Sequence, residues 1–134
     1  MIQYMRIERG DFVNNLVMAY IGDAVYELYV RDYLIKKGIS NVKSLQKASI
    51  NLVSAKAQVK ILNILTENNL LTEEEHDIVK RGRNSKSHKS KSTDIITYKN
   101  STGFECLIGN LYYKDKSRLE YIIEEVFKIY ENLW

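Results

Sequence analysis

The chain contains no proline among its 134 residues, and this absence constrains the fold more than any other single feature. Proline breaks or kinks a helix interior because it lacks the amide hydrogen and clashes with the preceding turn. Apolar residues recur along most of the chain at a spacing of about 3.6 residues, the period of an α-helix. The sequence therefore predicts an all-α helical bundle. Residues 1–134 are expected to form one domain, because no internal repeat or linker divides them and a chain of this length buries its own core.

Caps and breakers set the expected helix boundaries. They predict helices near residues 12–37, 41–50, 52–68, 72–83, 95–114 and 117–134. Two segments fit the capping box, in which a hydroxyl and a Glu three residues later satisfy helix amides reciprocally: Thr72 with Glu75, and Ser117 with Glu120. Residues 85–93 are polar, basic and aperiodic, which predicts a flexible loop.

The first predicted helix is apolar around most of its circumference. One stripe consists of Leu16, Tyr20, Ala24, Leu28 and Ile35, and its neighbour consists of Val13, Val17, Ile21, Val25 and Tyr29. A helix of this kind is buried on most sides, either at the centre of the fold or at a dimer interface. The same spacing and apolar neighbours predict core or interface packing, rather than base stacking, for Tyr20, Tyr26, Tyr29 and Tyr33.

The cysteine content and the N-terminus bear on the compartment. The single cysteine, Cys106, lies in an apolar segment, which predicts a buried reduced thiol and suits a reducing environment. No basic N-terminal stretch precedes an apolar one, and no apolar run approaches the roughly 20 residues of a membrane-spanning helix. A cytoplasmic location is therefore expected.

Two lone acids stand beside glycines in apolar, helix-period segments. Asp23 directly follows Gly22 in AYIGDAVYE, and Glu105 lies two residues after Gly103 in STGFECLIG. A glycine inside a helix costs about 1 kcal/mol relative to alanine, and a buried unpaired carboxylate is expensive. We therefore expect close backbone approach at the glycines and a cation at the acids. A divalent metal fits the acids, although a buried acid paired with an arginine is the alternative.

These two segments, together with KRGRN at residues 80–84, resemble the ribonuclease III family, and most closely its Mini-III subgroup. That subgroup is a stand-alone catalytic domain without a double-stranded-RNA-binding domain, and the resemblance runs from about Phe12 to the C-terminus. It implies a homodimeric, magnesium-dependent endoribonuclease, in which Mn²⁺ can substitute. Such an enzyme hydrolyses phosphodiester bonds of double-stranded RNA, leaves 5′-phosphate ends and matures the precursor of large-subunit (23S) ribosomal RNA. Asp23 and Glu105 would be its catalytic metal ligands.

The chain departs from the wider ribonuclease III pattern at two positions. Ala19 stands where the family has a Glu, and Thr102 stands where it has an Asp; both lie one helical turn from a retained acid. The resemblance therefore implies two protein carboxylates per subunit, with water, RNA phosphates or the Thr102 hydroxyl completing the shell beside Gly22. We expect weak metal binding without RNA. Mini-III sequences share both departures.

Two further acids have simpler interpretations. Glu27 is expected to pair with Arg31 one turn later, although it could share the face of Asp23. Asp94 is expected to cap the helix that follows it rather than to bind metal.

Positive charge is concentrated in residues 80–91, which include no acid. The six basic residues there are Lys80, Arg81, Arg83, Lys86, Lys89 and Lys91. Proteins recognise duplex RNA mainly through its phosphates and 2′-hydroxyls, so this segment is the candidate substrate-binding surface. Alternatively, the run is a solvated loop, with Arg81 and Arg83 neutralising helix-end carbonyls.

Two rival functions stay open at this point. A non-catalytic RNA-binding or ribosome-assembly factor on the same fold would have lost its site at Ala19 and Thr102, but the retention of Asp23 and Glu105 speaks against it. A helical protein-interaction domain would show no salt-dependent affinity for RNA duplexes. The sequence also leaves open whether a ribosomal protein presents the substrate.

Overall fold

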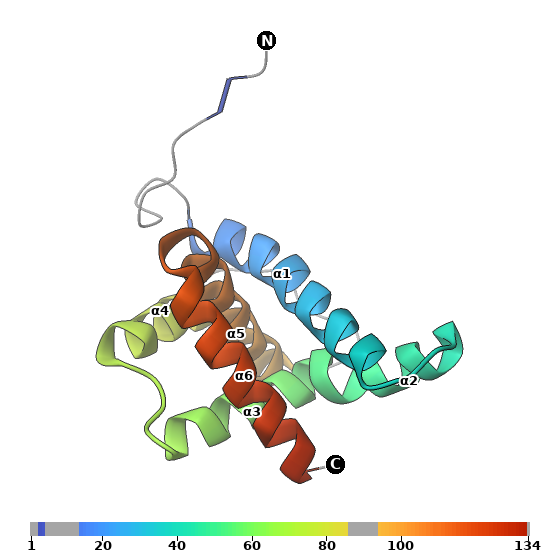
Figure 1. The fold of residues 1–134 in the computed structure, drawn as a ribbon. Coiled ribbons are helices and arrows are strands. Elements are labelled where there is room, and N and C mark those ends of the chain that lie inside the picture. The colour runs from blue at the N-terminus through green and yellow to red at the C-terminus, as the bar shows by residue number, and fades with distance from the viewer. Residues whose placement is uncertain (1–2, 5–13, 86–93, 134) are drawn as a thin grey trace.

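The computed structural model describes residues 3–4, 14–85 and 94–133. Within these residues the chain forms helices and no strand, which confirms the all-α prediction (Figure 1). In chain order the helices are α1 (Asn15–Lys36), α2 (Val42–Val53), α3 (Ala55–Glu67), α4 (Glu73–Asn84), α5 (Ile95–Lys114) and α6 (Lys116–Leu133). None of these described helices is both long and apolar enough to cross a membrane.

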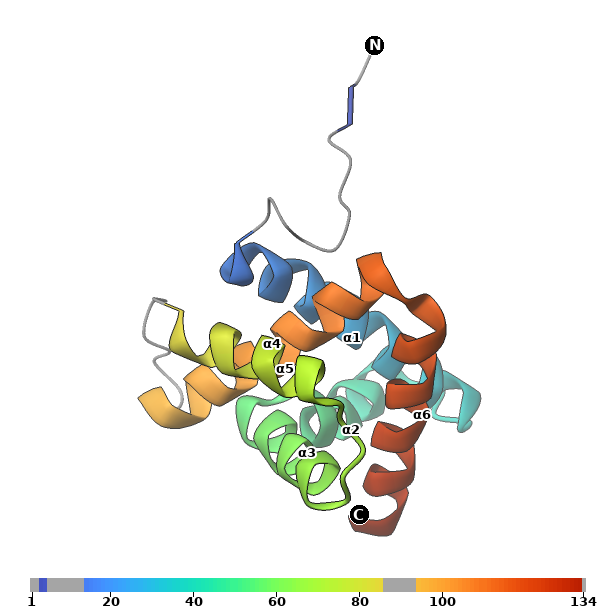
Figure 2. The ribbon, with the colours of Figure 1, turned by 90° about the vertical axis from the view of Figure 1, so that its left-hand side faces the viewer.

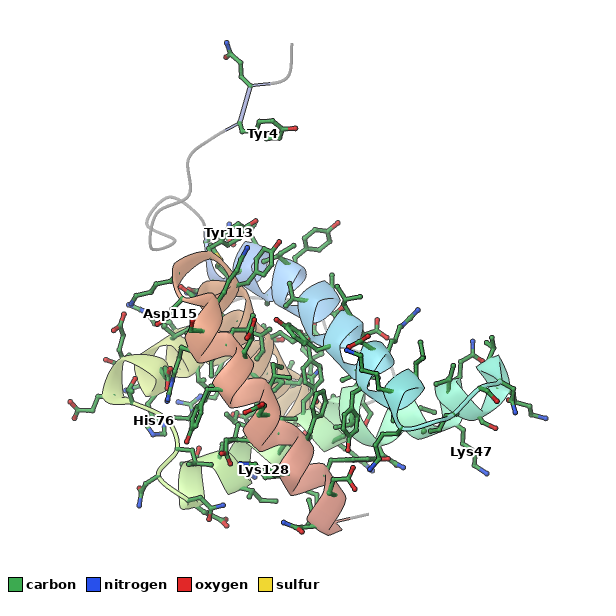
Figure 3. All side chains as sticks on the ribbon, in the orientation of Figure 1. Tyr4, Lys47, His76, Tyr113, Asp115 and Lys128 are labelled. Carbon is green, nitrogen blue, oxygen red and sulfur yellow. The ribbon has the colours of Figure 1, made fainter. Side chains whose placement is uncertain are left out.

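Side-chain caps start the helices, because the first amides of a helix have no partner within it. The predicted box of Thr72 and Glu75 is present in both directions: Glu75 N donates to Thr72 Oγ1 at 3.1 Å, and Thr72 N donates to Glu75 Oε1 at 2.9 Å. The predicted box at Ser117 is wrong. Asp115 (labelled in Figure 3) accepts from Arg118 N at 3.0 Å. Helix α6 therefore begins one residue earlier than predicted, at Lys116, and Ser117 lies inside it.

Helix α5 lies between α1 and α4 and is the most deeply buried element of the described fold (Figure 2). Its buried residues are Ser101, Thr102, Gly103, Phe104, Cys106, Leu107, Ile108, Gly109 and Leu111. Helices α3 and α6 also pack against α5. The side chains of α5 therefore have neighbours on nearly every side.

Glycines allow the backbones of α1 and α5 to meet. A Cβ atom on Gly22 would lie 1.8 Å from the backbone oxygen of Glu105, and one on Gly109 would lie 2.0 Å from that of Met18. Gly103 makes the equivalent approach to α4, where a Cβ would lie 2.6 Å from Val79 O. The expected close approach at Gly22 and Gly103 is thus confirmed, and it fixes how far the residues of α1 lie from those of α5.

Helix α1 is not the central helix, contrary to one of the two expected placements. Its core face consists of Met18, Ala19, Gly22, Val25, Tyr26, Val30 and Leu34. The stripe that begins at Leu16 faces outward instead, with Tyr20 81%, Leu28 69% and Ile35 57% exposed. Core packing holds for Tyr26, which is fully buried, but not for Tyr20.

Candidate functional site

The structure brings Asp23 and Glu105 together at the crossing of α1 and α5. Their carboxyl groups share a hydrogen bond, although 82 positions of chain separate them. Asp23 is exposed and Glu105 is half-buried. They open onto a hollow of about 250 Å³, whose lining residues are Leu16, Ala19, Tyr20, Asp23, Tyr98, Thr102 and Glu105.

The local helix geometry explains this proximity. Gly22 precedes Asp23 and lies against the backbone oxygen of Glu105 itself, so the two acids project from the point where the helices touch. On α5, Thr102 and Glu105 are three residues apart and share one face, as do Ala19 and Asp23 on α1. The four positions therefore surround the same hollow, and two of them carry carboxylates.

The carboxyl group of Glu105 is partly buried beside a second acid, Asp23, and its pKa is raised. Burial, the negative charge of Asp23 and the hydrogen bond with Asp23 raise the pKa of Glu105 to about 8, and the charge of Glu27 adds to this shift. The amide of Gln58 opposes it by donating to the carboxylate. In the described part of the chain, the ion pairs of Lys and Arg involve neither Asp23 nor Glu105, so the expected alternative of an arginine partner finds no support.

The donor atoms at the site suit a hard divalent cation. Carboxylate oxygens are preferred ligands of Mg²⁺, which keeps several waters and needs few protein groups. Among the residues that the structure describes, no group of three or more His, Cys, Asp or Glu side chains could hold a metal ion. Thr102 Oγ1 donates to Tyr98 O at 3.0 Å, which uses its hydrogen and leaves lone pairs on the oxygen. Among the described residues, the site thus offers two carboxylates and one hydroxyl oxygen.

Gln58 of α3 belongs to this site, although no motif in the sequence predicts it. Its side chain is 2% exposed, and its Nε2 lies 3.4 Å from Glu105 Oε2. One signal was available: Gln58 occupies a position on the apolar stripe that continues with Ile61, Leu62 and Leu65, where a polar residue needs a reason.

The two simpler acids behave as expected. Glu27 accepts from Arg31 at 3.2 Å, one turn along α1. Asp94 caps α5 by accepting from Thr97 N at 2.8 Å, and its hydrogen bonds to Thr97 hold the pKa of its carboxyl below the usual value. Neither residue lines the hollow.

Three of the six predicted basic residues lie in the described part of the chain, on the last turns of α4. Lys80 and Arg81 are exposed and Arg83 is half-buried. A Cβ on Gly103 would lie 3.4 Å from Arg83 N, so this end of α4 packs two residues away from Glu105. Lys86, Lys89 and Lys91 lie outside the described residues, as does the rest of the predicted loop up to Thr93.

Cys106 follows Glu105 but faces away from the hollow. It is fully buried beneath α4, close to where a Cβ on Gly82 would fall. Burial raises the pKa of its thiol to about 11. A thiol of this kind stays protonated near neutral pH, which confirms the prediction of a buried thiol.

Comparisons with known proteins agree with this geometry. Residues 16–116 match the family described as the ribonuclease III domain. Mini-ribonuclease 3 of Brevibacillus brevis is 47% identical over 123 residues, covering 90% of each chain. The Mini-ribonuclease 3 of Enterococcus faecalis is 44% identical over 118 residues, covering 87% of this chain and 89% of the relative. A crystal structure of a Fusobacterium nucleatum protein has a TM-score of 0.79 and 33% identity, covering 90% of this chain and 98% of that one. A match of this extent, on a fold that joins the two acid-bearing segments in one hollow, makes this chain a member of the ribonuclease III family, in its Mini-ribonuclease 3 group.

Proposed function

We propose that this protein is a magnesium-dependent endoribonuclease that hydrolyses phosphodiester bonds of double-stranded RNA and leaves 5′-phosphate ends. The observation that carries the proposal is the pair Asp23 and Glu105, two carboxyl groups within hydrogen-bonding distance in one hollow and without a basic partner among the described residues. The names of its Mini-ribonuclease 3 relatives support the same reaction class. The natural substrate that we propose is the precursor of large-subunit ribosomal RNA in the cytoplasm.

In this proposal Asp23 and Glu105 hold the ion. Mg²⁺ bound there would activate the attacking water and neutralise the charge that develops on the phosphate. Asp23 is exposed, so the sugar-phosphate backbone can reach it, whereas Glu105 is held from behind by Gln58. The rigid crossing at Gly22 fixes the two carboxylates before substrate arrives, which is the preorganisation that electrostatic catalysis needs.

Cleavage of a long RNA duplex by the purified protein tests the function directly. We expect cutting with Mg²⁺ or Mn²⁺, none after chelation with EDTA, and none of a single-stranded RNA of the same sequence. The products should carry 5′-phosphates, which a ligase that requires them can detect. Absence of cutting, even with a structured ribosomal RNA precursor, would instead favour a non-catalytic RNA-binding factor, and Ala19 and Thr102 would then mark an eroded site.

We also propose that the enzyme is a homodimer formed through the outer face of α1. Leu28 and Ile35 are 69% and 57% exposed there. The same face opens into a hollow of about 500 Å³ that is lined by Ala24, Val25, Leu28, Tyr29, Asp32 and Tyr112. A two-fold contact would bury one copy of this face against the other, and each subunit would then cut one strand. Sedimentation should give twice the 15.7 kDa of one chain, and a monomer under the conditions of cleavage would contradict the proposal.

The basic segment at residues 80–91 is proposed to bind the phosphates of the duplex. We expect Lys86→Ala, Lys89→Ala and Lys91→Ala together to weaken duplex binding and to flatten its salt dependence. The slope of log K against log salt should fall by about 1 for each phosphate that the variant no longer neutralises. Fluorescence anisotropy at several salt concentrations measures both quantities.

A matched control removes three lysines elsewhere, Lys36, Lys116 and Lys128, and therefore changes the net charge equally. It should leave the slope near that of the wild type. Equal slopes for the two triple variants would mean that residues 80–91 contribute only to the general charge of the protein.

A further inference from the structure

Gln58 is almost completely buried, yet its amide is only partly satisfied. The side chain is 2% exposed, and its Nε2 donates to Val53 O at 3.3 Å and to Glu105 Oε2 at 3.4 Å. Its Oε1 is buried and has no hydrogen-bond partner among the described residues. Buried amide oxygens are nearly always paired in folded proteins, so this one calls for an explanation.

The hydrophobic core does not require an amide at this position. The neighbouring core positions of α3 are Ile61, Leu62 and Leu65, and a methionine would fill the space of Gln58 without leaving an unpaired oxygen. What the amide adds is a pair of donors. One of them satisfies Val53 O at the end of α2, and the other reaches the site.

Tyr26 shows what a purely structural cap at this corner looks like. Its hydroxyl donates to Leu52 O at 2.8 Å, one residue before the carbonyl that Gln58 binds. Its ring packs edge-on against Phe104, with the centroids 5.1 Å apart. Tyr26 and Gln58 therefore both fasten the corner between α2 and α3, but only Gln58 has a hydrogen bond to a carboxylate of the hollow.

We propose that Gln58 is a positioning residue that holds the carboxylate of Glu105 in the orientation needed to bind the divalent ion. The inference rests on the proposed function, because it takes Glu105 to be a metal ligand. A glutamate has three rotatable bonds, and the amide fixes one of its oxygens from the buried side. An amide suits this task because it is neutral: a lysine or arginine would orient the carboxylate equally well but would cancel the negative charge that attracts the ion.

The test compares Gln58→Met with Tyr26→Phe. Gln58→Met keeps the length of the side chain and removes its donors, whereas Tyr26→Phe removes the neighbouring cap without touching Glu105. Binding of Mn²⁺ alone, without RNA, is followed by the electron paramagnetic resonance signal of the free ion. We expect Gln58→Met to weaken Mn²⁺ binding about tenfold, as other outer-shell substitutions do, and Tyr26→Phe to stay within about twofold of the wild type.

Steady-state cleavage supplies the second readout. Gln58→Met should lower kcat at limiting metal, recover at high Mn²⁺ concentration and leave the KM for duplex RNA unchanged. Gln58→Leu, which also lacks the donors, is measured in parallel so that one poorly folded variant does not decide the result. Wild-type Mn²⁺ affinity in both Gln58 variants would overturn the inference, and so would an equal loss in Tyr26→Phe, since the corner as a whole would then be responsible. A different result would show that the proposed function itself is wrong. In that case the wild type would bind no Mn²⁺, or would bind Mn²⁺ equally well after Asp23→Asn.

Discussion

Asp23→Asn should reduce cleavage of duplex RNA by about a thousandfold or more while leaving duplex binding intact. Asparagine has the size of aspartate but no charge, and a neutral amide is a poor replacement for a carboxylate in a site where the described residues supply two of them. Asp23 is exposed, so the substitution removes no core packing. Cleavage is measured under single-turnover conditions and binding by anisotropy with the same RNA.

The matched control is Asp77→Asn, the same substitution at an acid of α4 outside the hollow, which should cleave at the wild-type rate. Cleavage by Asp23→Asn at more than about a tenth of the wild-type rate would remove Asp23 from the metal site. Simultaneous loss of binding and cleavage would instead mean that Asp23 contributes to the duplex surface.

The thermal stability of Asp23→Asn shows whether the variant is folded. The pH dependence of that stability is expected to differ from that of the wild type. Because the folded-state pKa of Glu105 is raised to about 8, the folded protein holds this proton more tightly than the unfolded chain does. Without metal, the wild type should therefore lose stability as the pH rises from about 4.5 towards 8. Asp23→Asn removes the charge that contributes to the shift, so its melting temperature in EDTA should fall less between pH 5 and pH 8.

The sequence was sufficient where the determinants are local. The capping box at Thr72 and the cap at Asp94 were predictable because a cap depends on residues three positions apart. The wrong prediction of a cap at Ser117 also concerns local residues. Asp115 stands three residues before the amide of Arg118, and the helix is capped by this aspartate and not by Ser117.

The face that α1 buries could not be predicted, because apolar residues surround most of that helix. Periodicity identifies a core face only when a polar face contrasts with it. Contact with α5 makes the choice here: the backbones meet at Gly22 and Gly109, so the residues beside Gly22 are buried and the stripe containing Leu28 is left outside. The pairing of Asp23 with Glu105 came from the family resemblance, whereas the contact of Gln58 with Glu105 depends on α3, which no local pattern places beside α5.

Gly22→Ala should destabilise the fold by on the order of 3–5 kcal/mol, a large part of the stability of a domain this size. The added Cβ would lie 1.8 Å from the backbone oxygen of Glu105 and 2.8 Å from the backbone nitrogen of Gly109, and neither atom belongs to a side chain that can rotate away. Alanine gains about 1 kcal/mol over glycine in a helix, which is too little to offset the separation of α1 and α5. Chemical denaturation measures the free energy of unfolding.

Gly38→Ala is the matched control, because it adds the same methyl group where nothing lies within 4 Å. Its cost comes only from the backbone, whose φ of 98° disfavours a side chain, and should be about 1 kcal/mol. A Gly22→Ala protein as stable as Gly38→Ala would show that α1 and α5 can move apart with little loss in the free energy of unfolding. Gly22 contacts the backbone of Glu105, which carries the second carboxylate of the site. Separation of α1 from α5 should therefore weaken Mn²⁺ binding as well as lower the stability of the protein. Asp23→Asn changes only the charge, and the two variants together therefore distinguish what the site owes to the helix crossing from what it owes to the acids.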